Sequence, residues 1–517
     1  MGRVTHRASK AGEYKIPMIQ TDTSGKKKQV AVISQLAVFG LFLFFFLRIN
    51  PIIPYDADDW MYLSVFRIPL PLISAWNPTK VLPETLMPFV GWSAGHIFYP
   101  MLRDYVLSVT VAGGILLAIF VTLFGWSFYV FVKDRLHFPA FRSLCFEIVI
   151  LLFQFTIFRN RPTSNSLFTG ENFNCVFNYI VPGFVNATAV LLLMSCENYQ
   201  EHFLKLHVVK KVLMILLMYA AMFSNIYHSA ILAIFCSVYL LEHIIEWLRE
   251  KKQPLGKMIR DHLLYLILLI MWLMSLVLEL NGGRATNVQE FREKDYFTDL
   301  MQLRAMLGAL AKPFVTGLAV LVILHFVVMW NDHKIKREHD ETENVIIRQL
   351  KVSVISGILM TVYLLLLNSL LGYMSRIDAT WGMWFYLILI YCLLIACLIS
   401  RFPRLQRILI PLILVMAIFA YLPNGKYGTS SEESYETCNR IDHYLVNQLI
   451  EADKEQKEPI EFVVPDYRDT ELSWGMGDNM GDLIGTALVN AGIIDHVPEY
   501  TTVYSSDLLT EVSDGES

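Results

Sequence analysis

The chain has 517 residues, of which 55% are hydrophobic, 13% aromatic and only 17% charged. Soluble globular chains contain about 25% charged residues, and the mean hydropathy here is +0.45, so the composition excludes a soluble or a disordered protein. The formal net charge of −4 argues against nucleic acid as a partner. The seven cysteines lack the spacing of a zinc site or a disulfide scaffold. These features indicate an all-α polytopic membrane protein.

Apolar runs long enough to cross a bilayer occur throughout the first 422 residues. A helix needs about 20 mostly apolar residues to cross the hydrocarbon core, and a crossing segment must be helical because lipid offers the backbone no hydrogen-bond partners. The sequence predicts eleven spans, at 29–48, 105–132, 143–158, 179–197, 209–224, 229–247, 263–280, 312–330, 351–370, 381–400 and 408–422. The third and the eleventh are short.

Basic residues predict the orientation. Residues 1–28 contain seven Lys and Arg, and the first apolar run lacks a signal-peptide cleavage site, so this segment is expected to stay in the cytoplasm. With sides alternating from there, 26 of the 43 Lys and Arg fall in cytoplasmic segments, which is the positive-inside pattern. The expected location is therefore the cell (plasma or inner) membrane, with a cytoplasmic N-terminus and an extracytoplasmic C-terminus.

The chain is expected to have three parts: a basic N-terminal segment (1–28), a transmembrane domain (29–422) and an acidic extracytoplasmic tail (423–517). The tail holds 20 acidic against five basic residues, with a predicted strand at 460–465 and a helix at 482–491, so we expect a small α+β appendage. The first outer loop (49–104) carries six prolines between residues 69 and 100. Proline breaks helices, so its apolar pieces are too short to span and are predicted to form juxtamembrane helices over a cavity.

An acidic cluster opens this loop. Asp56, Asp58 and Asp59 lie a few residues after the first span, framed by Tyr55 and Trp60. Adjacent carboxylates repel, which raises the pKa of one of them, and such a carboxylate can act as a general base. A solvated acidic turn is the alternative interpretation. The flanking aromatic rings favour a membrane-level groove instead, and all three Asp are catalytic candidates.

Polar groups farther along the chain are candidates for substrate binding. Asn77, Lys80 and Glu84 lie within the first outer loop, although Lys80 and Glu84 have the spacing of a local ion pair. Arg284 follows two glycines, where backbone can approach an anion closely. His228 is also a candidate, although a hydrogen-bonded structural role is favoured for it.

Arg376 lies in a very short outer loop between two spans. A lone Arg at membrane depth is costly and is usually paired or functional, and its planar fork suits a phosphate. An ion pair with neighbouring Asp378 is the main alternative, and the phosphate role is preferred over it.

The cytoplasmic first segment, the acidic cluster in a long first outer loop and the many spans together resemble the GT-C glycosyltransferases. Within that class, Tyr55–Trp60 followed by Trp76–Glu84 resembles bacterial glucosyltransferase-type proteins of surface-polysaccharide loci. The resemblance covers about the first 110 residues, and the rest of the chain matches only by hydropathy and by the Arg of the short outer loop that contains Arg376.

The resemblance implies transfer of a hexose from a polyprenyl-phosphate donor to a cell-surface glycan or lipid-linked acceptor, on the extracytoplasmic side of the cell envelope. Asp58 or Asp59 would act as general base and an outer Arg would hold the donor phosphate, while membrane lipids surround the protein. No cofactor is expected, and a metal requirement is not predicted.

Two other functions remain open. A lipid-linked sugar flippase would use charged groups inside the spans, and the candidates there are Glu147, Gln154, Glu242, Glu246 and Glu279. A polysaccharide polymerase would also depend on outer arginines. The charged groups of the spans lie mostly near span ends, which favours an enzyme over a carrier, and the long acidic first outer loop favours the transferase over the polymerase.

Overall fold

The computed structural model describes residues 23–54, 56–64, 79–159, 164–165, 167–168, 172–250, 254–281, 296–371, 373–421, 435–466, 477–506 and 508. Each of the eleven predicted spans is helical there. The helices are α1 (Thr23–Phe44), α5 (Tyr105–Val130), α6 (Ala140–Thr156), α8 (Val181–Met194), α10 (Val208–Met222), α11 (Ile226–Glu250), α13 (Leu263–Leu280), α16 (Lys312–Lys334), α17 (Glu341–Leu371), α18 (Trp381–Arg401) and α19 (Leu409–Tyr421).

Shorter elements extend or connect these helices. π-Helical turns continue α1, α3 (Val81–Ser93), α5 and α7 (Phe173–Cys175), and a 3₁₀ turn joins α18 to α19. These turns are η1 (Phe45–Ile49), η2 (Ala94–Phe98), η3 (Phe131–Arg135), η4 (Val176–Ile180) and η5 (Pro403–Ile408). The connecting helices are α7 (Phe173–Cys175), α9 (Tyr199–Lys205), α12 (Leu255–Asp261) and α15 (Tyr296–Gly308), and a small antiparallel pair is formed by β1 (Phe158–Arg159) and β2 (Ser164–Asn165).

Nine helices in the described part of the chain are long and apolar enough to cross a membrane, so the protein is a multi-pass membrane protein by length and composition. The two predicted spans outside this group are α6, with 17 residues, and α10, with 15 residues. The number of eleven spans therefore stays a prediction.

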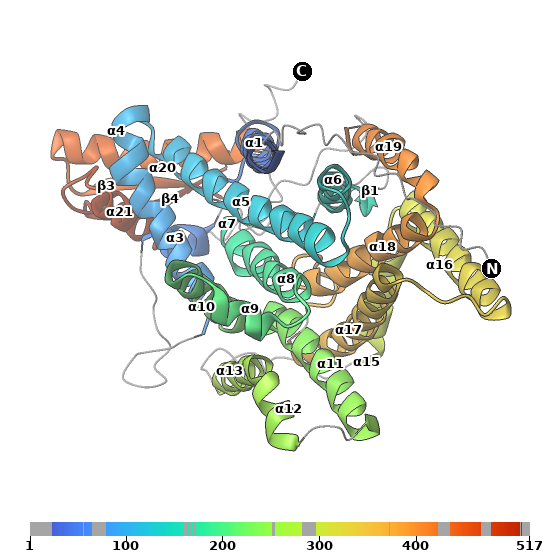
Figure 1. The fold of residues 1–517 in the computed structure, drawn as a ribbon. Coiled ribbons are helices and arrows are strands. Elements are labelled where there is room, and N and C mark those ends of the chain that lie inside the picture. Colours follow the sequence, from blue (N-terminus) through green and yellow to red (C-terminus); the bar gives the residue numbers. More distant parts are fainter. Residues whose placement is uncertain are drawn as a thin grey trace, which may run out of the picture.

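Burial separates central from peripheral helices. The helices α5, α8, α11, α17 and α18 pack side by side through the middle of the molecule (Figure 1). In the apolar 18-residue stretches of α18 and of the continuous helix Phe173–Met194, which ends with α8, 89% of the residues are buried, against 6% for α16 and 17% each for α13 and α19. The large apolar side chains that α16 exposes, such as Phe326 and Trp330, need an apolar solvent such as the bilayer.

The first outer loop is helical in its described parts, as predicted, and forms α2 (Ala57–Ser64), α3 (Val81–Ser93) and α4 (Tyr99–Leu102). The tail consists of α20 (Tyr435–Glu455), β3 (Ile460–Pro465), α21 (Met480–Asn490) and β4 (Tyr500–Ser505). The strands β3 and β4 pair in parallel, from Ile460 opposite Tyr500 to Pro465 opposite Ser505. The predicted strand and the predicted helix of the tail are both present.

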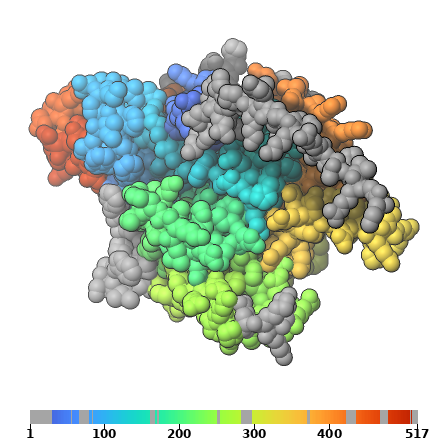
Figure 2. Space-filling model, viewed as in Figure 1, coloured from blue at the N-terminus to red at the C-terminus, as the bar shows by residue number. Residues whose placement is uncertain are grey.

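The tail packs against the first outer loop (Figures 1 and 2). Asn490 of α21 donates its side-chain N–H to the carbonyl of Ser64 at 2.6 Å. A Cβ built on Gly95 would lie 2.4 Å from the Cβ of Ala491, so only glycine permits this approach. His443 Nε2 of α20 lies 2.9 Å from Asp104 Oδ2, directly before α5. The helix that carries the acidic cluster is therefore enclosed between the membrane helices and the tail.

Candidate functional site

The acidic cluster builds the start of α2 through a reciprocal capping arrangement. Asp56 precedes the helix, and its Oδ1 accepts from the backbone N–H of Asp59 at 3.0 Å. Asp59 in turn accepts from the backbone N–H of Asp56 at 3.4 Å. This is the capping-box pattern, in which the residue before a helix and the third residue of its first turn satisfy each other's amides. The cluster thus fixes its own local backbone.

Asp59 also caps a second helix. Its Oδ1 accepts from the N–H of Asn174 at 2.5 Å, and its Oδ2 accepts from the N–H of Phe173 at 3.2 Å. The first amides of a helix lack partners within the helix, and a negative charge near them is favourable. Asn172 completes the arrangement, since its Oδ1 caps Cys175 N at 2.7 Å while its Nδ2 donates to Asp56 Oδ2 at 2.6 Å. The starts of α2 and α7 are therefore joined by side chains.

The three Asp have different surroundings. Asp59 is fully buried and bonded to three backbone amides. Asp56 is half-buried, and burial raises its pKa, opposed by hydrogen bonds from Asp59 and Asn172 and reinforced by the charge of Asp58. Asp58 is exposed, and no described residue donates to its carboxylate. Asp56 and Asp58 are accordingly the two carboxylates that a substrate could approach.

Arg376 contacts α7 at Cys175. Its Nε and a terminal nitrogen form a fork with the carboxylate of Asp378, at 3.1 and 2.7 Å. The same nitrogen lies 3.1 Å from Cys175 Sγ, and the guanidinium stacks on the rings of Tyr179 and Tyr373, at 4.8 and 5.2 Å. Burial lowers the pKa of Arg376, but the bonds to Asp378 outweigh it, so the pKa is raised and the charge is retained. The alternative pairing with Asp378 is thus present.

His228 is fully buried below this loop. Its Nδ1 lies 3.0 Å from Asn225 Oδ1, and its Nε2 lies 3.0 Å from the backbone carbonyl of Asp378. Asn225 also donates to the carbonyl of Asn178 in η4. His228 therefore joins α11 to the loop of Arg376, as its structural interpretation expects.

The remaining sequence candidates lie elsewhere. Lys80 precedes α3, and its Nζ is 3.9 Å from Glu279 Oε2 at the end of α13. Glu84 is buried in the first turn of α3. Asn77 and Arg284 lie outside the described residues. The structure thus joins the acidic cluster and Arg376 through α7, whereas Lys80 and Glu84 lie at the start of α3.

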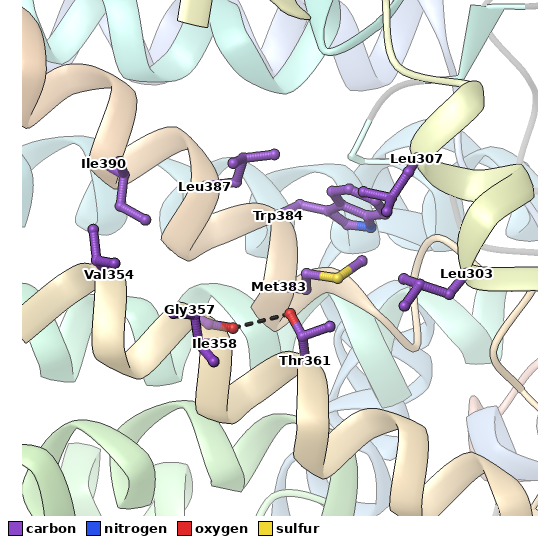
Figure 3. A pocket seen from close by; sticks show the side chains of 10 residues that line it. All are labelled: Leu303, Leu307, Val354, Gly357, Ile358, Thr361, Met383, Trp384, Leu387 and Ile390. Atoms are coloured by element: carbon purple, nitrogen blue, oxygen red, sulfur yellow. Dashed lines mark hydrogen bonds between the residues drawn. The ribbon is translucent and has the colours of Figure 1, made fainter. Parts of the chain in front are cut away.

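An apolar hollow of about 270 Å³ lies between α15, α17 and α18 (Figure 3), and its lining residues Met383 and Trp384 follow shortly after the Arg376 loop. Side chains of α15, α17 and α18 line it, including Leu303, Ile358 and Trp384. The hydroxyl of Thr361, which lines the hollow, already donates to the carbonyl of Gly357 at 2.9 Å. The Trp384 indole donates to Thr380 Oγ1 at 3.1 Å, and Thr380 donates to the Arg376 carbonyl at 2.7 Å. The hollow suits a hydrocarbon chain, because its polar groups are satisfied.

The sequence left the pairing of Arg376 with Asp378 open as an alternative, but it did not identify Asn172 as the residue that links the starts of α2 and α7. The capping-box spacing of Asp56 and Asp59 was a signal that could have been used. Within the described ranges, no group of three or more His, Cys, Asp or Glu is placed to hold a metal ion. No family model, curated protein or solved structure matches the chain.

Proposed function

We propose that the protein is a membrane glycosyltransferase that moves a sugar from a polyprenyl-phosphate donor to a glycan or lipid-linked acceptor on the extracytoplasmic face. The observation that carries this proposal is the meeting of two groups at α7. Asp59 accepts from Asn174 N, while Arg376 donates to Cys175 Sγ one residue later. Carboxylates for proton transfer and a cation for a phosphate therefore flank one short helix.

In this proposal Asp56 is the general base. A base works best when its pKa approaches the working pH, and the pKa of Asp56 is raised by burial and by Asp58. Asp56 takes the proton of the acceptor hydroxyl as that oxygen attacks the anomeric carbon. The bond between this carbon and the phosphate oxygen breaks, and the electron pair leaves with the polyprenyl phosphate. Asp59 holds the backbone rather than a proton.

Arg376 then stabilises the leaving phosphate. A fixed cation next to developing negative charge lowers the barrier more than a mobile one, because no reorganisation is needed during the reaction. Asp378, Tyr179 and Tyr373 hold the guanidinium in place. The apolar hollow between α15, α17 and α18 offers the donor's hydrocarbon chain a path.

Two contacts, of Asp59 with Asn174 and of Asn225 with Asn178, favour eleven membrane crossings. The first outer loop follows α1, and α5 with η3 carries the chain 31 residues away from it, about 46 Å at 1.5 Å per residue. Asp59 nevertheless contacts Asn174, so α6 must return the chain to the starting side. Asn225 likewise contacts Asn178 after the chain has run along α8, so α10 makes a second return. Both helices are short but connect opposite ends of the bundle.

The test is transfer in proteoliposomes. The purified protein is given a radiolabelled polyprenyl-phosphate hexose and an extracted cell-envelope glycan as acceptor. We expect label in the acceptor fraction with wild type and none with Asp56→Asn, while Asp495→Asn, an exposed tail variant, retains transfer. Equal rates of label transfer to the acceptor by wild type and Asp56→Asn would refute the assignment of Asp56 as general base.

Transport is the second candidate, and one observation favours it. Glu147 of α6 is fully buried within the spans, and the Nε2 of Gln35 in α1 lies 2.9 and 3.0 Å from its two oxygens. Buried ionisable groups in spans often mark transport pathways. Glu147→Gln should abolish the movement of a lipid-linked sugar across vesicles if the protein is a flippase, and should leave transfer intact if it is the proposed enzyme.

A further inference from the structure

A second apolar hollow lies at the other end of the bundle from the Arg376 loop. It has a volume of about 320 Å³ and is lined by α16, α18, η5 and α19. Along α18 it runs from Tyr391 to Ile399, about 12 Å at 1.5 Å per residue. Gly317 of α16 leaves room for the Tyr391 hydroxyl, which would lie 2.1 Å from a Cβ at that position.

The turn η5 closes this hollow and has two different faces. Leu405 and Ile408 line the hollow. A 3₁₀ helix has three residues per turn, so residues three apart share a face. Arg404 and Arg407 are also three apart, one position earlier, and form the adjoining face. Both arginines are exposed, and neither has an acidic partner within 4 Å in the described part of the chain.

The charge of this turn is not balanced locally. Residues 401–421 contain three arginines and no acid. Arg401 is the exception among the three, since it pairs with Asp332 of α16 at 2.9 Å. Arg404 and Arg407 therefore present two positive charges at the mouth of an apolar hollow. This combination fits a ligand with an anionic head and a hydrocarbon chain, because basic pockets between spanning helices bind such head groups.

We propose that this hollow binds an anionic phospholipid, with an acyl chain against Tyr391 and Ile395 and its phosphate at Arg404 and Arg407. The positive-inside pattern assigns this end of the bundle to the cytoplasmic leaflet. The lipid joins α16, which the protein itself barely covers, to α18 and α19. The inference does not rest on the proposed transfer reaction.

The test compares two lipids with the same acyl chains. Purified protein in detergent is titrated with dioleoyl phosphatidylglycerol or dioleoyl phosphatidylcholine, and bound lipid is counted by native mass spectrometry beside the thermal unfolding temperature. We expect phosphatidylglycerol to bind more tightly and to raise the unfolding temperature more. Arg404→Gln and Arg407→Gln should each weaken its binding about fivefold, the factor expected for one basic residue near an anionic lipid.

Two further variants and a soluble head-group analogue test the contribution of the lipid's acyl chain separately from that of its phosphate head group. Leu412→Trp fills the partly exposed rim of the hollow and should reduce phosphatidylglycerol binding with both arginines intact. Lys210→Gln removes an exposed charge from the start of α10 and should leave binding unchanged. Glycerol phosphate, which lacks acyl chains, should raise the unfolding temperature of no variant. Equal binding of the two lipids would overturn the proposal. An unchanged preference for phosphatidylglycerol over phosphatidylcholine in the variant that carries both Arg404→Gln and Arg407→Gln would also overturn it.

Discussion

The carboxylate of Asp59 accepts a hydrogen bond from the backbone N–H of Asn174 at 2.5 Å, across 115 positions of the chain. This contact joins the first outer loop to the beginning of the helix that continues through η4 and α8. Asp59, the last of the three acidic residues, thereby joins α2 to α7 through backbone amides, whereas the carboxylate of Asp58 is exposed. Substitutions in the cluster should therefore have separable effects.

Asp59→Asn is expected to lower stability. The amide keeps one oxygen acceptor but turns an NH₂ group toward backbone donors, and a hydrogen bond to a charged group contributes about 2 kcal/mol. The measurement is thermal unfolding of the purified protein in detergent, with Asp58→Asn as the exposed control. An unchanged unfolding temperature for Asp59→Asn would mean that the capping contacts contribute nothing to stability.

Asp58→Asn should shift the pH dependence of transfer. The pKa of Asp56 is raised by burial, and the charge of Asp58 raises it further, so activity should rise with pH as Asp56 loses its proton. Removing the charge of Asp58 lowers the pKa of Asp56 and moves the acid limb of kcat/KM to lower pH. The exposed tail variant Asp495→Asn should leave the limb in place. A shift to higher pH after Asp58→Asn would contradict the assignment of Asp56.

Arg376→Ala should weaken donor binding and also destabilise the loop, because the variant leaves buried Asp378 without its fork. Breaking a buried pair from one side typically costs about 3–5 kcal/mol. Arg376→Lys keeps the charge but loses the bidentate geometry, so its donor affinity should lie between wild type and Ala. Donor affinity and unfolding temperature are measured together. Loss of stability with normal donor affinity would make Arg376 purely structural.

The attachment of the tail should weaken as pH rises above neutral. Asp104 raises the pKa of His443, so the favourable contribution of this pair is complete below the ordinary His value and is lost as pH rises through the raised one. Burial raises the pKa of Asp442 well above its ordinary value, and its ionisation opposes docking in the same direction. The readout is protease release of the tail at pH 6 and pH 9, compared in wild type and His443→Gln. His496→Gln, on the exposed tail surface, should behave as wild type.

Cysteine labelling in intact cells tests the eleven crossings. In a chain without its native cysteines, Glu455→Cys on the exposed end of α20 should react with an impermeant reagent. Lys210→Cys should react only after the cells are opened, because α6 and α10 would place it in the cytoplasm. Labelling of Lys210→Cys in intact cells would mean that these two short helices do not cross.

The positions of the helices follow from the sequence because hydrophobic length alone determines them. Each of the eleven apolar runs is helical, and the predicted strand at 460–465 is present as β3. The helix α20 was missed, although Ile441, Leu445 and Leu449 recur at the four-residue spacing of a buried helical face. Its polar composition concealed a pattern that hydropathy does not detect.

The site was predicted less completely, and the reason is physical. Sequence spacing identifies carboxylates within one turn, but Asn174 and Cys175 of α7, which contact Asp59 and Arg376, lie more than a hundred residues from either. Distinguishing Asp59 from Asp56 and Asp58 requires the backbone amides that each faces, which depend on tertiary packing. The alternatives of ion pair and phosphate ligand for Arg376 likewise differ only by the orientation of Asp378.

The close approach of Gly95 and Ala491 has a consequence for biosynthesis. Residue 491 leaves the ribosome almost four hundred residues after Gly95, when the helices between them have already been inserted. The face of α2 and η2 that the tail covers therefore stays uncovered until the last segment has been synthesised. In a nascent chain arrested before Tyr435, the helix α2 with its acidic cluster would lack the tail residues that cover it in the complete protein.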